Sequence, residues 1–258
     1  MLVRCIKATM TNPSALLQKT GWNDASWGLT VGTEYEVYAV YRSWYGDSED
    51  AYLICDDING IGIKGWPIYA PMAYFEIVDG TMPSFWIKEP EFPGYYGPAG
   101  LMNDYEKLVD GERTALASFQ WMKCFLVGSE LMRLKETDTD GIVIFISEKI
   151  IGRDSIIKFI QKELNSPYYP YQGGWDNLLT DLLDLSWINK KHIDIVHYNL
   201  PVLDDSEMQN YFSVLKTVFD CWGRNSRYTT HNNLGKPCMN IYFRDLIKHK
   251  VEKLWGGI

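Results

Sequence analysis

Long hydrophobic runs are missing from this sequence of 258 residues. No stretch approaches the roughly 20 apolar residues that are needed to cross a bilayer. The first residues, MLVRCIKATMTNP, lack the apolar core of a secretory signal. Hydrophobic residues make up 46% and charged residues 22% of the chain, which is the balance of an ordinary globular protein. We therefore expect a cytoplasmic protein without a membrane segment.

Cysteines are few and show no metal-binding pattern. The five cysteines, an odd number, form no C-x-x-C pair, and a chain of this length does not need disulfide bonds for stability. The spacing of Cys221, His231 and Cys238 matches no common zinc site. The acidic segment 135–141 fails as a calcium loop, because the twelfth position of that loop is Ser147 instead of an acid. We expect reduced thiols, no metal and no cofactor.

Basic residues are outnumbered by acidic ones, 25 against 33, which gives a net charge of −8. This balance argues against direct contact with nucleic acid, because phosphates require a basic surface. The charge is also unevenly distributed. From Glu163 to Asp220 there are nine acids and three bases, whereas the residues after Asp220 include seven bases and two acids. The acidic segment indicates either a basic partner or a solvated face.

The first 90 residues predict β structure. Residues 33–41, TEYEVYAVY, alternate polar and apolar side chains. Residues 51–63 read as two short strands around Asn59-Gly60, which is a two-residue hairpin signal. Frequent Gly, Pro, Asp and Asn between such runs favour a small β-barrel or rolled sheet. A short helix is expected at 14–21, and the Pro- and Gly-rich residues 90–100 mark a boundary.

The rest of the chain predicts helices, followed by strands and helices in alternation. Residues 91–140 are expected to form a helical linker. Beyond it, strands are expected at 142–150, 192–200 and 238–243, and helices at 153–164, 175–185 and 205–222. This alternation predicts an α/β layer with a mainly parallel three-stranded sheet. The predicted architecture is an α+β protein with two domains, residues 1–90 and 141–258, that the linker joins.

Residues 167–188, PYYPYQGGWDNLLTDLLDLSWI, combine an aromatic turn with a two-sided helix. At about 100° per residue, Trp175 and the leucines gather on one half of the helix. The other half carries Asp176, Asn177, Thr180, Asp181 and Asp184. Asp176, Thr180 and Asp184 form one row without a lysine four residues away to neutralise it. Because such a row costs stability, it favours a surface that meets a basic partner.

The pattern L-x-x-P-Y-Y, followed by G-x-W-D-x-L-x-x-x-L-x-D-L-S-W-I, runs from Leu164 to Ile188. It resembles the barstar family of ribonuclease inhibitors, and the order of expected strands and helices from Ile142 to Phe243 is similar to that family as well. In the family, the aromatic loop and the acidic helix plug the active site of a basic ribonuclease by mimicking phosphate. The resemblance implies a partner-binding surface made of Tyr168, Tyr169, Tyr171, Gly173, Asp176, Thr180, Asp181 and Asp184.

Two departures from the family pattern bear on the identity of the partner. Thr180 stands where the family has its main inhibitory aspartate, and Thr217 and Cys221 replace glutamates on the third helix. The N-terminal segment, with VGTEYEVYAV and MPSFW, resembles the small β domain of some bacterial toxin-immunity proteins. Together, the resemblances imply a cytoplasmic immunity protein, of the toxin–antitoxin or contact-dependent inhibition type. They imply a partner that is a basic nuclease toxin other than barnase.

Two alternatives remain open. One is a non-inhibitory two-domain adaptor whose β domain binds a separate partner through aromatic residues near Trp66, Tyr69 or Trp86. The other is a hydrolase that uses Asp176, Asp181 or His197. The hydrolase has little support, because the sequence contains no G-x-S-x-G, H-E-x-x-H or G-x-x-x-x-G-K-[ST] motif. The tyrosines of the aromatic turn also admit two interpretations, as interface residues or as core under the turn.

Overall fold

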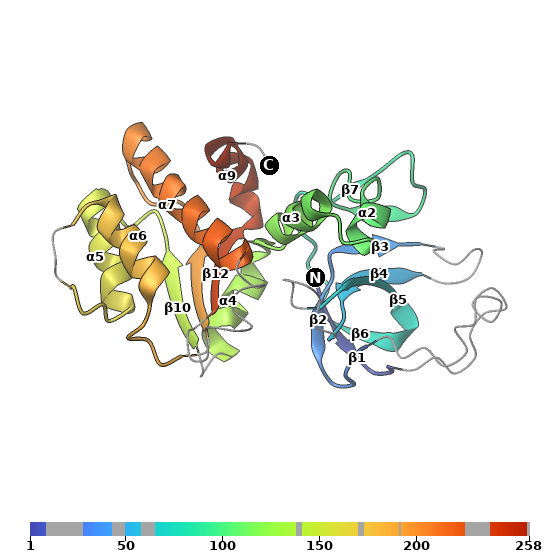
Figure 1. Ribbon diagram of the computed structural model, residues 1–258. Coiled ribbons are helices and arrows are strands. Elements are labelled where there is room, and N and C mark those ends of the chain that lie inside the picture. The colour runs from blue at the N-terminus through green and yellow to red at the C-terminus, as the bar shows by residue number, and fades with distance from the viewer. Residues whose placement is uncertain are drawn as a thin grey trace. The chain divides into compact units, whose positions relative to one another are not determined.

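The computed structural model describes residues 1–8, 28–42, 50–57, 65–137, 141–169, 173–190, 192–224 and 238–256. The chain divides into two compact units, Met1–Met122 and Lys123–Ile258. Both helices and sheets are present, and one of the three sheets is parallel (Figure 1). Within the described ranges, no helix is both long and apolar enough to span a bilayer.

The first unit contains two antiparallel sheets. One has the strand order β2-β1-β6, formed by β1 (Leu2–Cys5), β2 (Glu34–Glu36) and β6 (Phe75–Asp79). The other has the order β5-β4-β3-β8-β7, formed by β3 (Ala39–Tyr41), β4 (Ala51–Cys55), β5 (Pro67–Pro71), β7 (Ile87–Lys88) and β8 (Tyr95–Gly97). The predicted strand at 33–41 is thus two strands in different sheets. No pairing among the described strands closes a barrel.

Of the hairpin predicted at 51–63, the structure describes the first strand, β4. Strands β4 and β5 pair in antiparallel fashion, from Ala51 with Pro71 to Cys55 with Pro67. The described strand that pairs with β4 thus begins at Pro67, beyond the predicted range. The predicted second strand, which ends at Ile63, lies outside the described residues. The residues Asn59 and Gly60 themselves, and the helix predicted at 14–21, lie outside the described part of the chain.

Alternating side chains along β4 give the first unit two cores. Tyr52 and Ile54 pack with residues of the β2-β1-β6 sheet, such as Val3. Leu53 points to the opposite face and belongs to a second cluster with Phe119. That cluster is supplied by α2 (Tyr105–Val109) and α3 (Arg113–Met122), which cover the five-stranded sheet (Figure 1). Residues 91–122 therefore pack within the first unit.

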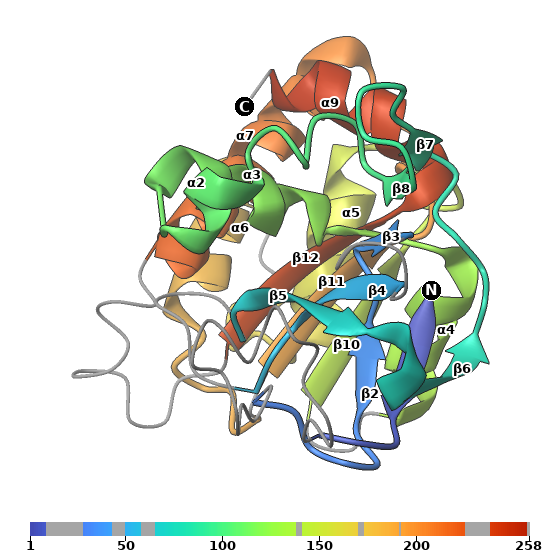
Figure 2. The same ribbon diagram turned by 90° about the vertical axis from the view of Figure 1, so that its right-hand side faces the viewer.

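The second unit is built on a parallel sheet with the strand order β10-β11-β12-β9. Its strands are β9 (Phe125–Leu126), β10 (Gly141–Ile146), β11 (His192–His197) and β12 (Cys238–Arg244). Figure 2 shows the three longer strands side by side. The predicted parallel sheet is confirmed, but it has four strands and not three. The additional strand, β9, is only two residues long, which is too short for any periodic signal in the sequence.

Helices cover both faces of this sheet (Figure 1). The connections from β10 to β11 and from β11 to β12 contain α5 (Arg153–Glu163), α6 (Trp175–Asp184) and α7 (Asp205–Arg224). Both connections run in the same direction along the sheet, so right-handed crossovers place these helices on one face. The chain then closes with α9 (Lys248–Trp255). On this side, Ile144, Ile195 and Ile241 form an in-register buried row.

The other face is covered by α4 (Gly128–Thr137), which lies between β9 and β10 in the chain. Leu131 on α4 is fully buried and packs with Val196, Val143 and Phe145 of the sheet. Helix α4 therefore belongs to the second unit. The stretch predicted as a linker, residues 91–140, is divided between the two units, and the border lies after Met122 instead of near 90 and 140.

Candidate partner-binding surface

Helix α6 is the element that carries the predicted surface. It begins at Trp175 after two glycines and ends at Asp184, one residue before the predicted end. Leu185 then adopts a left-handed conformation with φ 48° and stops the helix. Leu178 and Leu182 have no exposed surface, and burying a leucine side chain contributes about 1.5–3 kcal/mol. The leucine side is therefore core, as the sequence predicted.

The outer side of α6 carries the acidic row. Asp176 and Thr180 are exposed, and Asp184 is half-buried. The Thr180 hydroxyl donates to the backbone oxygen of Asp176 at 2.8 Å, and Asp184 accepts a hydrogen bond from the Ser186 hydroxyl at 3.2 Å. No described lysine, arginine or histidine forms an ion pair with either aspartate. The structure thus places three of the predicted residues together on an acidic face.

Asp181 departs from the prediction. The sequence placed this residue on the polar half of the helix, but the side chain is buried, with 2% of its surface exposed. Its carboxylate accepts hydrogen bonds from Gln161 Nε2 at 2.8 Å and from Ser166 Oγ at 3.2 Å. Asp181 lies three residues after Leu178 and four before Leu185, and this spacing puts it on the leucine side. Asp181 is therefore not available for direct contact with a partner.

The aromatic turn precedes α6 and displays two tyrosines. Tyr168 is 55% exposed and Tyr169 is 43% exposed, so neither is core under the turn. The ring of Tyr168 still contacts the edge of Trp187, with 6.2 Å between ring centroids. Trp187 is held in turn, because its Nε1 donates to the backbone oxygen of Leu164 at 3.1 Å. Tyr171, the third predicted tyrosine, lies outside the described residues.

Gly173 has a packing requirement of its own. A Cβ atom at this position would lie 2.5 Å from the side chain of Asn177, which is in the first turn of α6. Any other residue would force these groups apart, since real Cβ atoms do not approach so closely. Gly173 is half-buried. It lets the chain pass close to α6, and this explains a glycine at the position without reference to a partner.

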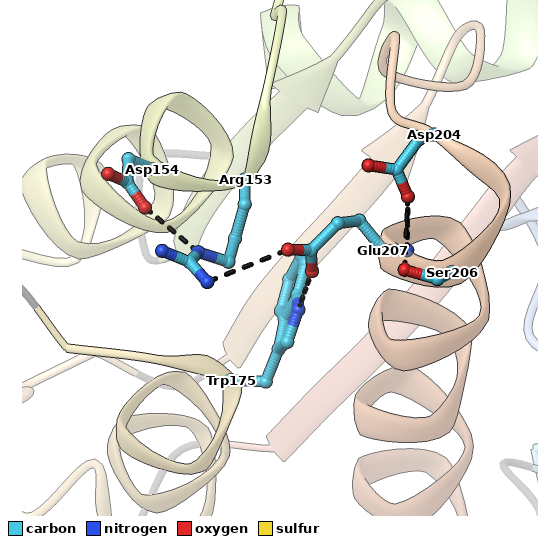
Figure 3. A network of polar contacts seen from close by, with 6 residues as sticks. All are labelled: Arg153, Asp154, Trp175, Asp204, Ser206 and Glu207. Atoms are coloured by element: carbon cyan, nitrogen blue, oxygen red, sulfur yellow. Dashed lines mark hydrogen bonds and ion pairs between the residues drawn. The ribbon is translucent and has the colours of Figure 1, made fainter.

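Side chains from three helices meet at the start of α6 (Figure 3). Glu207, in the first turn of α7, accepts a hydrogen bond from Trp175 Nε1. The same carboxylate lies 3.5 Å from Nη1 of Arg153, whose Nε donates to Asp154 at 2.9 Å. These contacts connect the first turns of α5, α6 and α7. They were not predicted, because residues so far apart in the sequence leave no local signal.

Asp204 caps α7 in the same region. Its carboxylate accepts hydrogen bonds from the backbone N–H of Glu207 at 2.9 Å and from the Ser206 hydroxyl at 3.1 Å (Figure 3). These bonds, the backbone one above all, hold the pKa of Asp204 below its ordinary value. The spacing of Asp204 and Glu207 is that of a capping box, and this is the one part of the cluster that the sequence could have indicated.

A hollow of about 680 Å³ opens beside this cluster, between the starts of α5 and α7. Ile151 and Val202 form a parallel bridge at its wall and are 66% and 50% exposed. Its charged lining consists of Arg153, Asp154, Asp204 and Glu207. With three acids and one base, the hollow suits a basic group better than a phosphate. It was not predicted from the sequence.

The residues considered for a hydrolase do not form a catalytic group. His197 is fully buried, and its ring nitrogens lie 2.7 Å from the Tyr211 hydroxyl and 3.2 Å from the backbone oxygen of Tyr242. Burial lowers the pKa of His197 to about 4. Asp181 is also buried, while Asp176 lies on the exposed side of α6. Within the described ranges, no three His, Cys, Asp or Glu residues are grouped as metal ligands.

The remaining predicted positions have structural surroundings of their own. Tyr69 and Trp86, considered for an adaptor surface, are 2% and 5% exposed and belong to the cores of the first unit. Thr217 on α7 is half-buried and donates to the backbone oxygen of Ser213 at 2.9 Å. Cys221 is half-buried and a free thiol.

The chain has no match among known proteins in three comparisons. No protein-family model matches it, and neither a curated protein nor a solved structure does.

Proposed function

We propose that this protein binds and inhibits a basic nuclease toxin, in the manner of an immunity protein. The proposed docking surface, called the α6–turn surface below, consists of Tyr168, Tyr169, Asp176, Thr180 and Asp184. The observation that carries the proposal is the acidic row of α6, whose two aspartates form no ion pair with a described basic residue and which follows a turn with two exposed tyrosines.

The chemistry of this surface suits a nuclease active site. Such a site binds phosphates and is therefore lined with lysine and arginine. Carboxylates in a row offer negative charge to those side chains and speed the encounter of the two proteins. Tyrosine contributes a large, rigid contact area with a polar tip, which is typical of the residues that dominate binding energy. The acidic hollow beside the start of α6 adds to the same negative potential.

The cluster around Glu207 favours tight binding. Because Trp175 is held by Glu207, the first turn of α6 is fixed to α7 before any partner arrives. A surface that does not need to reorganise loses less conformational entropy on binding. Asp176, the next residue after Trp175, is therefore presented on a rigid element.

The departures from the barstar pattern define the partner further. Thr180 supplies a hydroxyl where the family has its main inhibitory aspartate, and Thr217 and Cys221 supply no charge on α7. The surface therefore presents fewer carboxylates than the family it resembles. We propose a nuclease other than barnase, which acts in the cytoplasm of a bacterial cell, where this inhibitor would protect cellular RNA.

The first experiment measures binding to a panel of small basic bacterial nucleases by surface plasmon resonance, together with inhibition of RNA cleavage. For any nuclease bound by the wild-type chain, Asp176→Lys with Asp184→Lys should weaken affinity by roughly 100-fold or more, because both changes place like charges at the interface. The loss should shrink at high salt.

A matched control is available on the first unit. Glu106 and Asp110 are exposed acids four residues apart at α2, and Glu106→Lys with Asp110→Lys alters the net charge of the chain by the same amount. This control should retain its affinity. Equal losses in both double variants would show that only net charge matters and would overturn the assigned surface. Failure of the wild-type chain to bind or inhibit any nuclease would overturn the function.

A further inference from the structure

A continuous chain of hydrogen bonds runs from the interior of the second unit to the aromatic turn. Gln161 on α5 and Ser166 both donate to Oδ2 of Asp181 on α6, at 2.8 and 3.2 Å. The Ser166 hydroxyl also accepts from the backbone N–H of Tyr168 at 3.2 Å. The backbone N–H of Tyr169 donates to the backbone oxygen of Ser166 at 3.1 Å. Both exposed tyrosines are thus connected to one buried carboxylate.

Asp181 and the two side chains that donate to it are all buried. Gln161, Ser166 and Asp181 are 0%, 6% and 2% exposed. Both hydrogen-bond partners of Asp181 are neutral donors, so no opposite charge offsets the removal of its carboxylate from water. A leucine would fit the apolar pattern of α6, but it would leave two buried donors, Gln161 Nε2 and Ser166 Oγ, without an acceptor. Asp181 is therefore the acceptor for two buried donors, and one of them, Ser166, begins the aromatic turn.

The path of the chain between α5 and α6 shows which segment this acceptor holds in place. After α5 the chain turns sharply at Asn165, which has a positive φ of 49°. Ser166 follows directly. Its side-chain oxygen accepts a hydrogen bond from the N–H of Tyr168, and its backbone oxygen accepts one from the N–H of Tyr169. On the other side, the ring of Tyr168 contacts Trp187. Asp181 fixes the serine from the inside, and Trp187 fixes the ring from the outside.

We propose that Asp181 is a positioning residue, which holds the Tyr168–Tyr169 turn in its binding conformation through Ser166 and makes no contact with the partner. This assignment rests on the proposed function of the α6–turn surface. It replaces the interpretation of Asp181 as a contact residue. The same acid that appears in the sequence beside the binding row acts from beneath that row.

The free protein provides the first test. Amide hydrogen exchange of Tyr168 and Tyr169 is measured by NMR for the wild-type chain, Asp181→Asn and Ser166→Ala. The hydrogen bonds that connect Asp181 through Ser166 to Tyr168 and Tyr169 are called the tether below. If the tether exists, both variants exchange faster at these two amides than the wild-type chain does, while amides of β11 retain their protection. Asp181→Asn keeps the size of the side chain, and Ser166→Ala keeps the acid, so a failure of one variant to fold leaves the other informative.

Binding provides the second test, with a nuclease from the panel that the wild-type chain binds. Loss of a preordered turn should weaken affinity by roughly tenfold in Asp181→Asn and Ser166→Ala. Because Asp181 does not touch the partner, this loss should be nearly the same at low and high salt. Asp176→Asn serves as the comparison, since it removes a direct charge and its effect should diminish as salt rises.

The outcomes separate the two proposals. Unchanged exchange at Tyr168 and Tyr169 in both variants would overturn the tether, whatever the binding data show. Faster exchange with unchanged affinity would overturn the role of the tether in binding. A salt-dependent loss in Asp181→Asn equal to that of Asp176→Asn would mean that Asp181 contacts the partner directly. A wild-type chain that binds no nuclease would overturn the proposed function, while the exchange data would still decide whether the tether exists.

Discussion

The acids on the two sides of α6 differ in their hydrogen-bond and ion-pair partners. On the inner side, Asp181 accepts hydrogen bonds from two buried donors. On the outer side, Asp176 and Asp184 have no described basic partner. Some other surface acids are paired, as on the β2-β1-β6 sheet, where Arg4 lies 2.8 Å from one glutamate and 2.6 Å from another. Exposed acids without a described ion pair also occur elsewhere, as with Glu106 and Asp110 at α2. What distinguishes the row on α6 is its position directly after the turn that exposes Tyr168 and Tyr169.

The two outer acids also differ from each other. Asp176 lies in the first turn of α6, where the positive end of the helix dipole stabilises a carboxylate. Asp184 is the last residue of the helix, where the dipole disfavours negative charge, and no basic residue occupies that turn. Asp184 is thus the acid with the least structural justification, and the comparison between the two sides can be tested most sharply there.

The largest expected effect on stability concerns the interior of the second unit and involves His197 on β11. Its pKa is near 6.5 in an unfolded chain and about 4 in the folded one. Between these values the unfolded state binds more protons, so the free energy of unfolding falls as pH drops from about 6.5 to 4 and levels off below. The loss should be on the order of 3 kcal/mol, measured by urea unfolding of the second unit.

A double variant isolates this contribution. His197→Phe with Tyr211→Phe removes the titrating ring together with the hydroxyl that bonds to it, so no buried donor is left without a partner. Carboxylates elsewhere titrate in both proteins, and the difference between the two pH profiles should follow His197 alone. Parallel profiles for the two proteins would contradict a buried, neutral histidine.

A smaller effect is expected at the junction of the three helices. Glu207→Ala removes the acceptor of Trp175 Nε1 and the partner of Arg153. Since hydrogen bonds to charged groups contribute about 1.5–3 kcal/mol and Glu207 is partly exposed, we expect a loss near 1.5 kcal/mol in urea unfolding. Glu252→Ala, which removes an exposed ion pair with Lys248 on α9, is the control and should cost much less. Equal losses of unfolding free energy in the two variants would show that Glu207 does not stabilise the junction of the three helices.

The smallest effect has opposite signs at the two ends of the acidic row. Asp184→Lys should raise the free energy of unfolding by about 0.5 kcal/mol, because it places a positive charge at the negative end of the helix dipole. Asp176→Lys should lower it by a similar amount for the converse reason. Thermal and urea unfolding of the single variants measure both. If Asp184→Lys proves destabilising, the acid has a structural role, and the case for a docking surface weakens accordingly.

The sequence predicted the features that depend on long, regular patterns. Helix α6 and the parallel strands β10, β11 and β12 were expected within a few residues, because leucine spacing and apolar runs are local properties. The outward position of Asp176 followed from the same spacing of residues around the helix. Asp181 was misplaced because a polar residue at the margin of an apolar stripe was counted with the polar half. Its spacing from Leu178 and Leu185 carried the correct information.

Other features depend on tertiary packing and could not be predicted. The border after Met122 exists because α3 places Phe119 on a sheet formed by residues far earlier in the chain. Likewise, β9 is recognisable as a strand only because Phe125 and Leu126 align with the end of β12. Trp175 and Glu207 meet only after three helices have packed together. In each case the residues concerned are distant in sequence, and no local periodicity announces the contact.

The position of α4 sets a limit on how this protein can be divided. A fragment that begins at residue 141, where the second domain was predicted to start, would lose the edge strand β9 and the helix α4, which covers Val143, Phe145 and Val196. One face of the sheet would then expose apolar side chains to solvent, and aggregation of the fragment would compete with its folding. A fragment that is meant to contain the complete second unit should therefore begin no later than Lys123, so that it includes β9 and α4.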